Sequence, residues 1–265
     1  MSDGDADDRI QYRKEGGLRW LIVNRPEKRN ALSIEMRLRA LEVIHEVERD
    51  ADARVLIVAG AGETFISGGD ISEFVEQRGD AEAAARINGL TELLLHELQN
   101  LEKPVIAMIH GFCFGGGLLL AASCDLRLCA DNALFCYPAA RLGIAYPMHL
   151  TRLILNLTGV AAAREMMYTA RRYTAGEAAA MGLANRVVPK AELETYTRGY
   201  AQEIANNAPL SIKASKIALD ECLKEPGQRD PERAARILAA CDASEDLGIG
   251  ARAFLGKKKP VFIGR

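Results

Sequence analysis

Two continuous apolar runs constrain the fold of this chain more than any other feature. Val55–Ala59 and Val105–Ile109 are bounded by glycine or proline and contain no polar residue. Such runs are typical of strands that are buried on both faces of a sheet. Leu126–Ala130 is a further candidate strand, and Leu18–Asn24 is apolar and β-prone. The sequence therefore predicts a sheet with both faces covered.

Helical patterns alternate with these runs, so the predicted fold class is α/β. Ser33 is placed to cap a helix in which Met36, Leu41, Ile44 and Val47 recur at helical spacing up to Asp50. Thr174 and Glu177 form a capping-box signal for a helix over Ala178–Met181, and Gly182 is placed to end it.

The last quarter of the chain is predicted to be a separate helical layer. From about residue 190 to 255 the pattern is almost wholly helical, with breaks near Pro209 and Pro226-Gly227. With 265 residues, of which 49% are hydrophobic, the chain can bury the core of one large domain with a small appendage.

Charge and cysteine content exclude several classes of function. The net charge of −2 gives no global attraction to nucleic acid or to an anionic membrane. The six cysteines have irregular spacing and form no Cys-x-x-Cys pair, which favours buried reduced thiols in the cytoplasm.

Residues 1–8 are acidic where a signal peptide would be basic or apolar, and we expect them to be disordered. No apolar stretch is long enough to span a bilayer, and no histidine lies in a metal-binding cluster.

Two glycine-rich segments carry the most chemical information. Gly115-Gly116-Gly117 lies between a predicted strand and an apolar helix, and Gly68-Gly69-Asp70 is a second tight turn. Nucleotide-binding loops are excluded because Gly117 stands where a phosphate-binding lysine should be and Leu120 replaces the last glycine of a dinucleotide fingerprint. Ser123 lies outside any Gly-x-Ser-x-Gly elbow. What such segments can offer is free backbone N–H groups at a helix N-terminus.

Nearly the whole chain carries motifs in a definite order and spacing. They are Asn24–Ser33, Ala59–Ile71, Lys103–Ala107, His110–Gly117, Cys124–Arg127, Ala178–Val188 and Ala253–Pro260. In this order and spacing the motifs resemble those of the enoyl-CoA hydratase (crotonase) superfamily. The resemblance implies a spiral of ββα units over residues 9–205 and a C-terminal helical segment, residues 206–265, that builds trimers or dimers of trimers.

The resemblance also implies a site for an acyl-CoA thioester. The N–H groups of Gly69 and Gly116 would hold the thioester oxygen and stabilise an enolate. No cofactor is expected beyond the CoA moiety of the substrate, and no metal. The residues implied in CoA binding are Arg29, Asn30, Ala31, Ser67, Gly68, Asp70, Ile71, Gly117, Phe254 and Lys257.

The chain departs from the family where hydratases carry two glutamates. Counting from the glycine run places Leu119 and Ala139 at these positions, where they would line the acyl pocket, so hydration by paired glutamates is not expected. Tyr146 and His149 follow in the same region and are the candidate replacements. The resemblance, together with this departure, implies a lyase or isomerase with non-standard acid and base groups, with a Tyr146-dependent decarboxylase or a non-catalytic CoA-thioester-binding subunit as alternatives.

Overall fold

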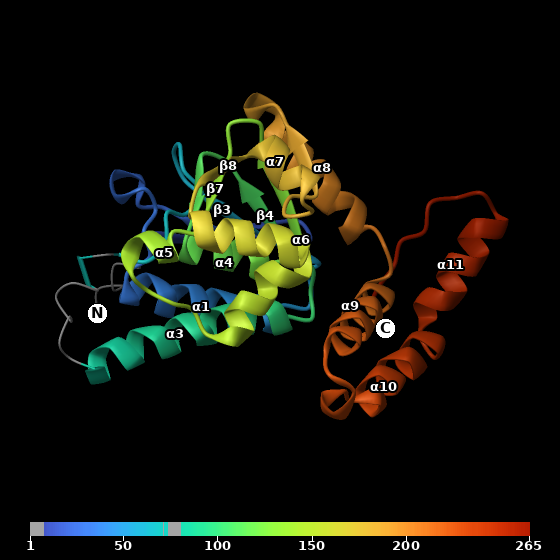
Figure 1. Ribbon diagram of the computed structural model, residues 1–265. Helices are drawn as coiled ribbons and strands as arrows, with labels where there is room; N and C mark the ends of the chain where they lie inside the picture. Colours follow the sequence, from blue (N-terminus) through green and yellow to red (C-terminus); the bar gives the residue numbers. More distant parts are fainter. Residues whose placement is uncertain (1–7, 71, 74–80) are drawn as a thin grey trace, which may run out of the picture.

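A six-stranded sheet forms the centre of the molecule (Figure 1). The computed structural model describes residues 8–70, 72–73 and 81–265. Strands β1 and β2 pair antiparallel, and all other pairs in this sheet are parallel. In spatial order the strands are β1 (Ile10–Glu15), β2 (Leu18–Val23), β3 (Val55–Gly60), β4 (Val105–Ile109), β6 (Leu126–Ala130) and β9 (Arg186–Val188).

Both faces of this sheet are buried, as the apolar runs predict. Because side chains alternate along a strand, Leu56 and Val58 of β3 enter one hydrophobic cluster, whereas Val55 and Ile57 enter another. The first cluster is covered by α1 (Ile34–Arg49), α3 (Ala81–Asn100), α4 (Gly116–Ser123) and α6 (Met148–Thr169). The second is covered by α8 (Leu193–Ala205).

A second, three-stranded sheet lies beside the first. Its strands are β5 (Phe112–Phe114), β7 (Leu134–Cys136) and β8 (Arg172–Thr174), with β5 and β7 parallel and β7 and β8 antiparallel. The remaining short elements are η1 (Pro26–Lys28), α5 (Ala139–Leu142), α7 (Ala175–Ala180), η2 (Lys190–Glu192) and η3 (Pro226–Gln228).

The predicted helix caps are confirmed. The Ser33 side chain accepts a hydrogen bond from the Met36 N–H at the start of α1, and Asp50 follows the last helical residue. Thr174 and Glu177 form a complete capping box. The helix that they cap, α7, starts at Ala175 and so lies slightly earlier than predicted.

The chain ends in three helices that stand apart from the two sheets (Figure 1). They are α9 (Pro209–Leu223), α10 (Pro231–Asp242) and α11 (Glu245–Leu255), and residues 209–265 are called the C-terminal arm below. The predicted breaks at Pro209 and Pro226 are confirmed. The arm is held to the rest of the molecule at α9, where Lys216 Nζ lies 2.8 Å from Asp125 Oδ2.

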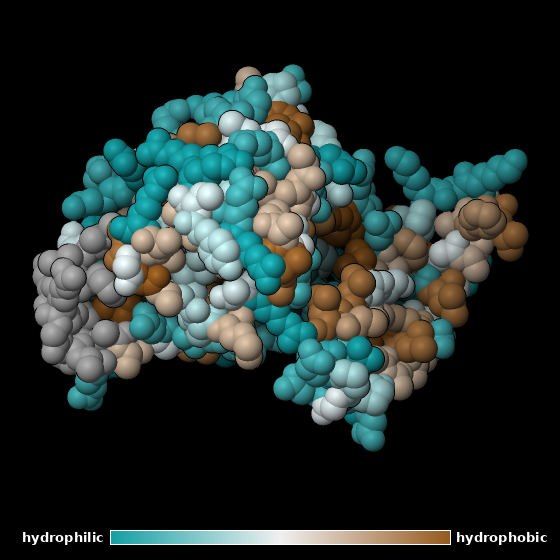
Figure 2. Space-filling model, in the orientation of Figure 1, coloured by the Kyte–Doolittle hydropathy of each residue, from teal (hydrophilic) through white to brown (hydrophobic). Residues whose placement is uncertain are grey.

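The arm exposes much apolar surface. Figure 2 shows hydrophobic residues over the arm and in the hollow between it and the body of the molecule. The large apolar side chains exposed there are Leu219, Leu223, Leu238, Leu247, Phe254, Leu255, Val261 and Ile263. Within the described residues, no helix combines the length and the hydropathy needed to cross a membrane. The predicted disordered start, residues 1–8, lies outside the described residues except for Asp8.

Candidate active site at two glycine turns

The two glycine turns meet at one point of the fold. A β-carbon placed on Gly116 would lie 3.5 Å from the Gly69 nitrogen and 3.6 Å from the Gly68 α-carbon. Pairing beside β5 brings the turns together, because the Ile66 N–H donates to Phe112 O and the Phe114 N–H donates to Ile66 O, each at 3.1 Å. Both turns therefore follow segments that lie side by side at β5.

The N–H groups of Gly69 and Gly116 take no part in the hydrogen bonds that hold the two turns together. The Leu32 N–H donates to Gly68 O (2.9 Å) and the Asp70 N–H donates to Leu32 O (3.1 Å), so Leu32 occupies one side of the turn and the Gly69 N–H faces the other. Gly116 is the first residue of α4, where an N–H has no partner inside its helix. Across the described part of the chain, neither N–H has a protein acceptor.

The backbone at both turns adopts conformations that favour glycine. Gly68 has a φ of 121° and Gly115, the N-cap of α4, has a φ of 52°. The Gly115 N–H donates to Cys136 O at 3.0 Å, which ties the second turn to the end of β7. The segment that follows β7, with Tyr137 and Ala139, is thereby held beside this turn.

Leu119 and Ala139 are buried apolar residues and carry no proton-transfer group. Leu119 lies in the first turns of α4 and is fully buried, while Ala139 begins α5 and is 5% exposed. Both side chains belong to the main hydrophobic cluster. An acid or base for chemistry at the glycine turns must therefore come from another segment.

Tyr146 reaches the second turn. A β-carbon placed on Gly115 would lie 3.7 Å from the Tyr146 hydroxyl oxygen. The ring packs edge-on against Tyr137, with ring centroids 5.1 Å apart. Burial raises the pKa of Tyr146, and it raises the pKa of Tyr137 to about 12. The Tyr146 phenol is therefore protonated at neutral pH, and it can donate a hydrogen bond or a proton but is a poor base.

His149 has a different environment. Its Nε2 lies 3.4 Å from Glu92 Oε2 on α3, and its side chain is 58% exposed. It lines a cavity of about 510 Å³ between α3 and α6, together with Glu92 and His96. None of its described contacts joins it to the glycine turns, so the two candidate replacements from the sequence have different surroundings.

The implied CoA-binding loop is joined to the first turn. The Ser67 N–H donates to Arg29 O at 3.1 Å, which places Arg29, Asn30 and Ala31 beside Ser67 and Gly68. The Asn30 side chain is fully buried, and its amide bonds the Arg25 N–H and three carbonyl groups. Asn30 therefore shapes the loop, and its fully buried side chain is not accessible to a ligand.

Asp70 and Gly117 also have structural roles. Burial raises the pKa of Asp70, but hydrogen bonds from Arg25 (2.7 Å) and the Ser72 N–H (3.0 Å) outweigh it and lower the pKa overall. Gly117 packs against the main chain, since a β-carbon there would lie 2.1 Å from Ile66 O. Ile71, also implied in CoA binding, lies outside the described residues.

Sequence reasoning missed an aromatic and cationic cluster next to Arg29. The Arg29 guanidinium lies 5.7 Å from the centre of the Phe112 ring, and that of Arg172 lies 5.8 Å from Phe112 and 5.7 Å from Phe114. The two rings are 4.9 Å apart. The spacing of two residues between Phe112 and Phe114 could have placed both rings on one face of a strand.

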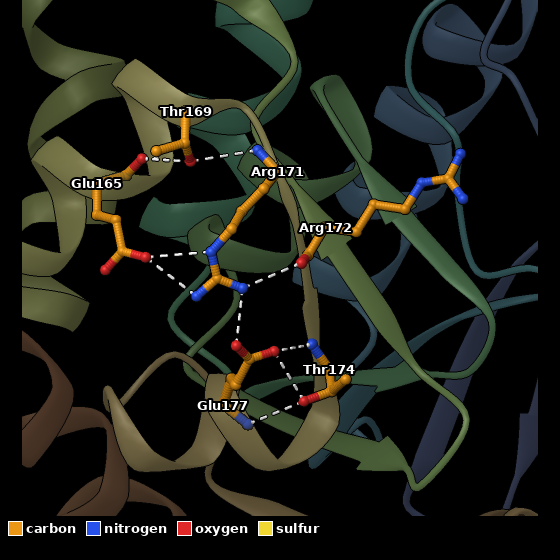
Figure 3. A network of polar contacts seen from close by, with 6 residues as sticks. All are labelled: Glu165, Thr169, Arg171, Arg172, Thr174 and Glu177. Atoms are coloured by element: carbon orange, nitrogen blue, oxygen red, sulfur yellow. Dashed lines mark hydrogen bonds and ion pairs between the residues drawn. The ribbon is translucent and has the colours of Figure 1, made fainter.

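A polar network holds Arg172 in this position (Figure 3). Arg171 bonds Glu165 and Glu177, and Glu177 also accepts a hydrogen bond from the Thr174 N–H at 2.8 Å. The Arg172 side chain points away from this network, because neighbouring residues of a strand face opposite sides. The network thus fixes β8 while leaving Arg172 free to face Phe112.

Phe254 and Lys257 do not join the site within one chain. Phe254 lies in the last turn of α11 and Lys257 follows this helix in the C-terminal arm, and both side chains are exposed. The described residues also contain no group of three or more His, Cys, Asp or Glu side chains that could hold a metal ion.

Comparison with known proteins identifies relatives along the whole chain. The family model for enoyl-CoA hydratase/isomerase matches residues 13–265. The short-chain-enoyl-CoA hydratase of Clostridium acetobutylicum is 34% identical over 93% of this chain and 94% of its own. The carnitinyl-CoA dehydratase of Escherichia coli K12 is 36% identical over 97% of this chain and 98% of its own.

Solved structures agree with these relatives. The crystal structure of an enoyl-CoA hydratase/carnithine racemase from Magnetospirillum magneticum has a TM-score of 0.92 and 33% identity, and covers 98% of this chain and 97% of its own. A putative family protein from Hyphomonas neptunium has a TM-score of 0.91 and 34% identity, and covers 97% of this chain and 98% of its own. The crotonase-like fold with C-terminal helices is thereby confirmed, and the chain belongs to the enoyl-CoA hydratase/isomerase family.

Proposed function

We propose that this chain is an acyl-CoA lyase or isomerase that holds the thioester oxygen between the N–H groups of Gly69 and Gly116. The observation that carries the proposal is the meeting of two turns whose N–H groups have no acceptor within the described residues. A thioester enolate places negative charge on that oxygen, and each preorganised donor typically contributes about 3–4 kcal/mol of transition-state stabilisation.

Tyr146 is the proposed proton donor. Its hydroxyl lies beside Gly115, and its raised pKa keeps it protonated at neutral pH. A phenol in this place can deliver a proton to the enolate carbon or to a departing oxygen, which are steps of lyase and isomerase reactions. A protonated phenol is a poor base and does not take over the base role of either glutamate. We therefore expect acid–base chemistry different from hydration by paired glutamates.

Decarboxylation is the second candidate function, and the state of Tyr146 favours it. When a carboxylate leaves the carbon next to a thioester, the reaction requires an oxyanion hole and a proton donor but no general base. Two N–H groups and a protonated phenol meet this requirement.

The nucleotide end of CoA is proposed to bind at Arg29, Arg172, Phe112 and Phe114. Guanidinium groups form charge-assisted hydrogen bonds with phosphates, and aromatic rings stack on a base. The cluster is continuous with the turn of Ser67 and Gly68 through the bond between Ser67 and Arg29. No cofactor other than CoA is needed for this chemistry.

A Gly116→Ala variant tests the oxyanion site. The added methyl group would lie in ordinary contact with Gly68 and Gly69, where the oxygen is proposed to bind, and alanine is a better helix former than glycine. We expect acyl-CoA thioesters to raise the melting temperature of the wild type but not of this variant. Gly176→Ala on α7, where nothing lies within 4 Å of the added group, is the matched control. A folded Gly116→Ala protein with unchanged affinity would reject the assignment.

The reaction class is tested by incubation of the protein with short, branched, aromatic and malonyl-type acyl-CoAs, followed by mass spectrometry. Lyase activity changes the mass of the thioester by one water, and decarboxylation lowers it by CO₂. Isomerisation changes the chromatographic retention time of the thioester but not its mass. Saturable binding without any product would favour the non-catalytic CoA-binding subunit.

A further inference from the structure

A buried cation lies directly behind the first glycine turn. Arg37, on α1, is 5% exposed, and a β-carbon placed on Gly69 would lie 2.7 Å from its Nη2. The guanidinium therefore occupies the space that a side chain at residue 69 would need. Standard bond lengths place Nη2 within about 5 Å of the Gly69 nitrogen, which is one of the two proposed donors to the thioester oxygen.

One nitrogen of this guanidinium has hydrogen-bonding capacity that the described residues do not fill. Nη1 is buried and has no hydrogen-bond partner among the described residues. The nearest carboxylate oxygen, Glu73 Oε2, is 3.7 Å away, too far for a hydrogen bond, and is itself buried without a partner. Buried polar groups in folded proteins are nearly always hydrogen-bonded, so an ion pair whose facing atoms form no hydrogen bond, beside a candidate site, needs an explanation.

A hydrogen bond to the start of α1 holds the Glu73 carboxylate away from Arg37. Its Oε1 accepts a hydrogen bond from the Ile34 N–H (3.1 Å), at the start of α1. Burial lowers the pKa of Arg37, while the carboxylates of Glu73, Asp70 and Glu35 counteract this effect. Arginine nevertheless stays charged at neutral pH because its ordinary pKa is above about 12.

The missing partner of such a group is a carboxylate. The planar fork of a guanidinium matches the two oxygens of a carboxylate, and water exclusion strengthens the pairing. With the thioester oxygen between Gly69 and Gly116, a carboxylate a few bonds along the acyl chain reaches the Arg37 edge between Nη1 and Nη2. A neutral acyl chain would leave this edge unpaired, and a cationic one would be repelled.

We propose that Arg37 selects acyl groups that carry a carboxylate, so that the substrates are CoA thioesters of dicarboxylic acids. The proposal rests on the proposed function, because it takes Gly69 as a wall of the acyl site. It assigns to α1 a recognition group that the sequence motifs of the family do not include.

Isothermal titration with two thioesters of equal chain length tests the proposal. Glutaryl-CoA ends in a carboxylate and valeryl-CoA in a methyl group, and we expect wild-type protein to bind glutaryl-CoA about tenfold more tightly or better. Equal affinity, or tighter binding of valeryl-CoA, would overturn the proposal while leaving the proposed function intact. If neither thioester binds, the proposed function fails and this proposal fails with it.

Variants of α1 separate recognition from a structural role. Arg37→Met should reduce the affinity ratio of glutaryl-CoA to valeryl-CoA to about one, whereas a purely structural role would weaken binding of both thioesters and keep the ratio. Arg39→Met, on the same helix and paired with Glu42 and Glu46, is the control and should keep the wild-type ratio. Glu73→Gln keeps an acceptor for the Ile34 N–H but removes the competing charge, so we expect it to raise the ratio severalfold. If Arg37→Met does not fold, the wild-type ratio and Glu73→Gln still decide the matter.

Discussion

Each glycine of the run Gly115-Gly116-Gly117 is explained by a different requirement. Gly115 has a left-handed φ of 52°, and Gly117 packs against the Ile66 carbonyl with no room for a β-carbon. Gly116 has neither restriction, since an added β-carbon would meet only ordinary contacts. The fold therefore does not require glycine at residue 116, whereas the proposed binding of a thioester oxygen at its N–H would.

Hydration of crotonyl-CoA should be slow because residues 119 and 139 carry no carboxylate. Each lost acid–base group usually costs a factor of about 10²–10⁴ in rate. We expect the turnover number of the wild-type protein on crotonyl-CoA to be lower by at least this factor than that of a glutamate-bearing hydratase measured in parallel. A comparable turnover number would show that other groups supply the proton transfers.

Replacement of Tyr146 by phenylalanine should remove the proton donor without closing the site. We expect kcat on the best substrate to fall about 10²–10⁴-fold while affinity for the thioester changes little. Tyr168→Phe, on the exposed side of α6, is the control.

Because the pKa of Tyr146 is raised above 10, the tyrosine-dependent rate should persist through neutral pH and be lost only as pH rises through that higher pKa. A rate that falls near pH 7 with Tyr146 intact would assign the role to another group.

At the scale of elements, β8 serves the site through its two faces. Arg171 packs on the Tyr173 ring at 3.7 Å and bonds Glu165 and Glu177, which anchors the strand to α6 and α7. Arg172 extends from the opposite side of this network toward Phe112 and Phe114. The strand thus joins a structural network to a surface suited to a nucleotide.

Loss of Arg172 should weaken binding of the nucleotide part of CoA alone. We expect Arg172→Gln to lower affinity for an acyl-CoA severalfold but to leave affinity for the matching acyl-pantetheine, which lacks the nucleotide, unchanged. Arg186→Gln on β9 is a control for loss of an exposed arginine. Isothermal titration gives both affinities. Equal weakening of both ligands by Arg172→Gln would place the nucleotide elsewhere.

Elements with strong local signals could be predicted from the sequence. β4 and β6 coincide with their apolar runs, and the caps at Ser33 and Thr174 depend on residues three positions apart. The small sheet was missed because each of its strands has three residues, too few for a periodic pattern. Its existence depends on pairing between distant segments, such as β7 with β8.

The same distinction applies to the candidate site. The glycine turns are local motifs and were predicted. The motifs do not indicate how closely the two turns approach each other. The position of Arg37 depends on contacts of α1 with Gly69 and Glu73, and that of Arg172 on packing against β5. These contacts join segments far apart in the chain, so no spacing in the sequence indicates them.

At the scale of the whole molecule, the C-terminal arm lacks a core of its own. Ile217 and Ile237 are its buried apolar residues, whereas Leu219, Leu238 and Phe254 are exposed by half or more. Exposed apolar surface of this extent typically marks an interface. We propose that other copies of the chain cover the arm in a trimer or a dimer of trimers, which could bring Phe254 and Lys257 to a neighbouring CoA site.

Assembly should therefore be measurable on the intact chain and lost with the arm. Light scattering is expected to give a mass near three or six times the 28.9 kDa of one chain. A chain that ends before Pro209 should aggregate or fail to assemble, because it loses the arm and exposes the surface around Asp125 that α9 covers. Leu238→Glu and Phe254→Glu place a charge on the exposed face without removing a helix, and they should shift the protein toward monomers. A monodisperse full-length monomer would contradict the assembly and any contribution of Phe254 or Lys257 to a neighbouring site.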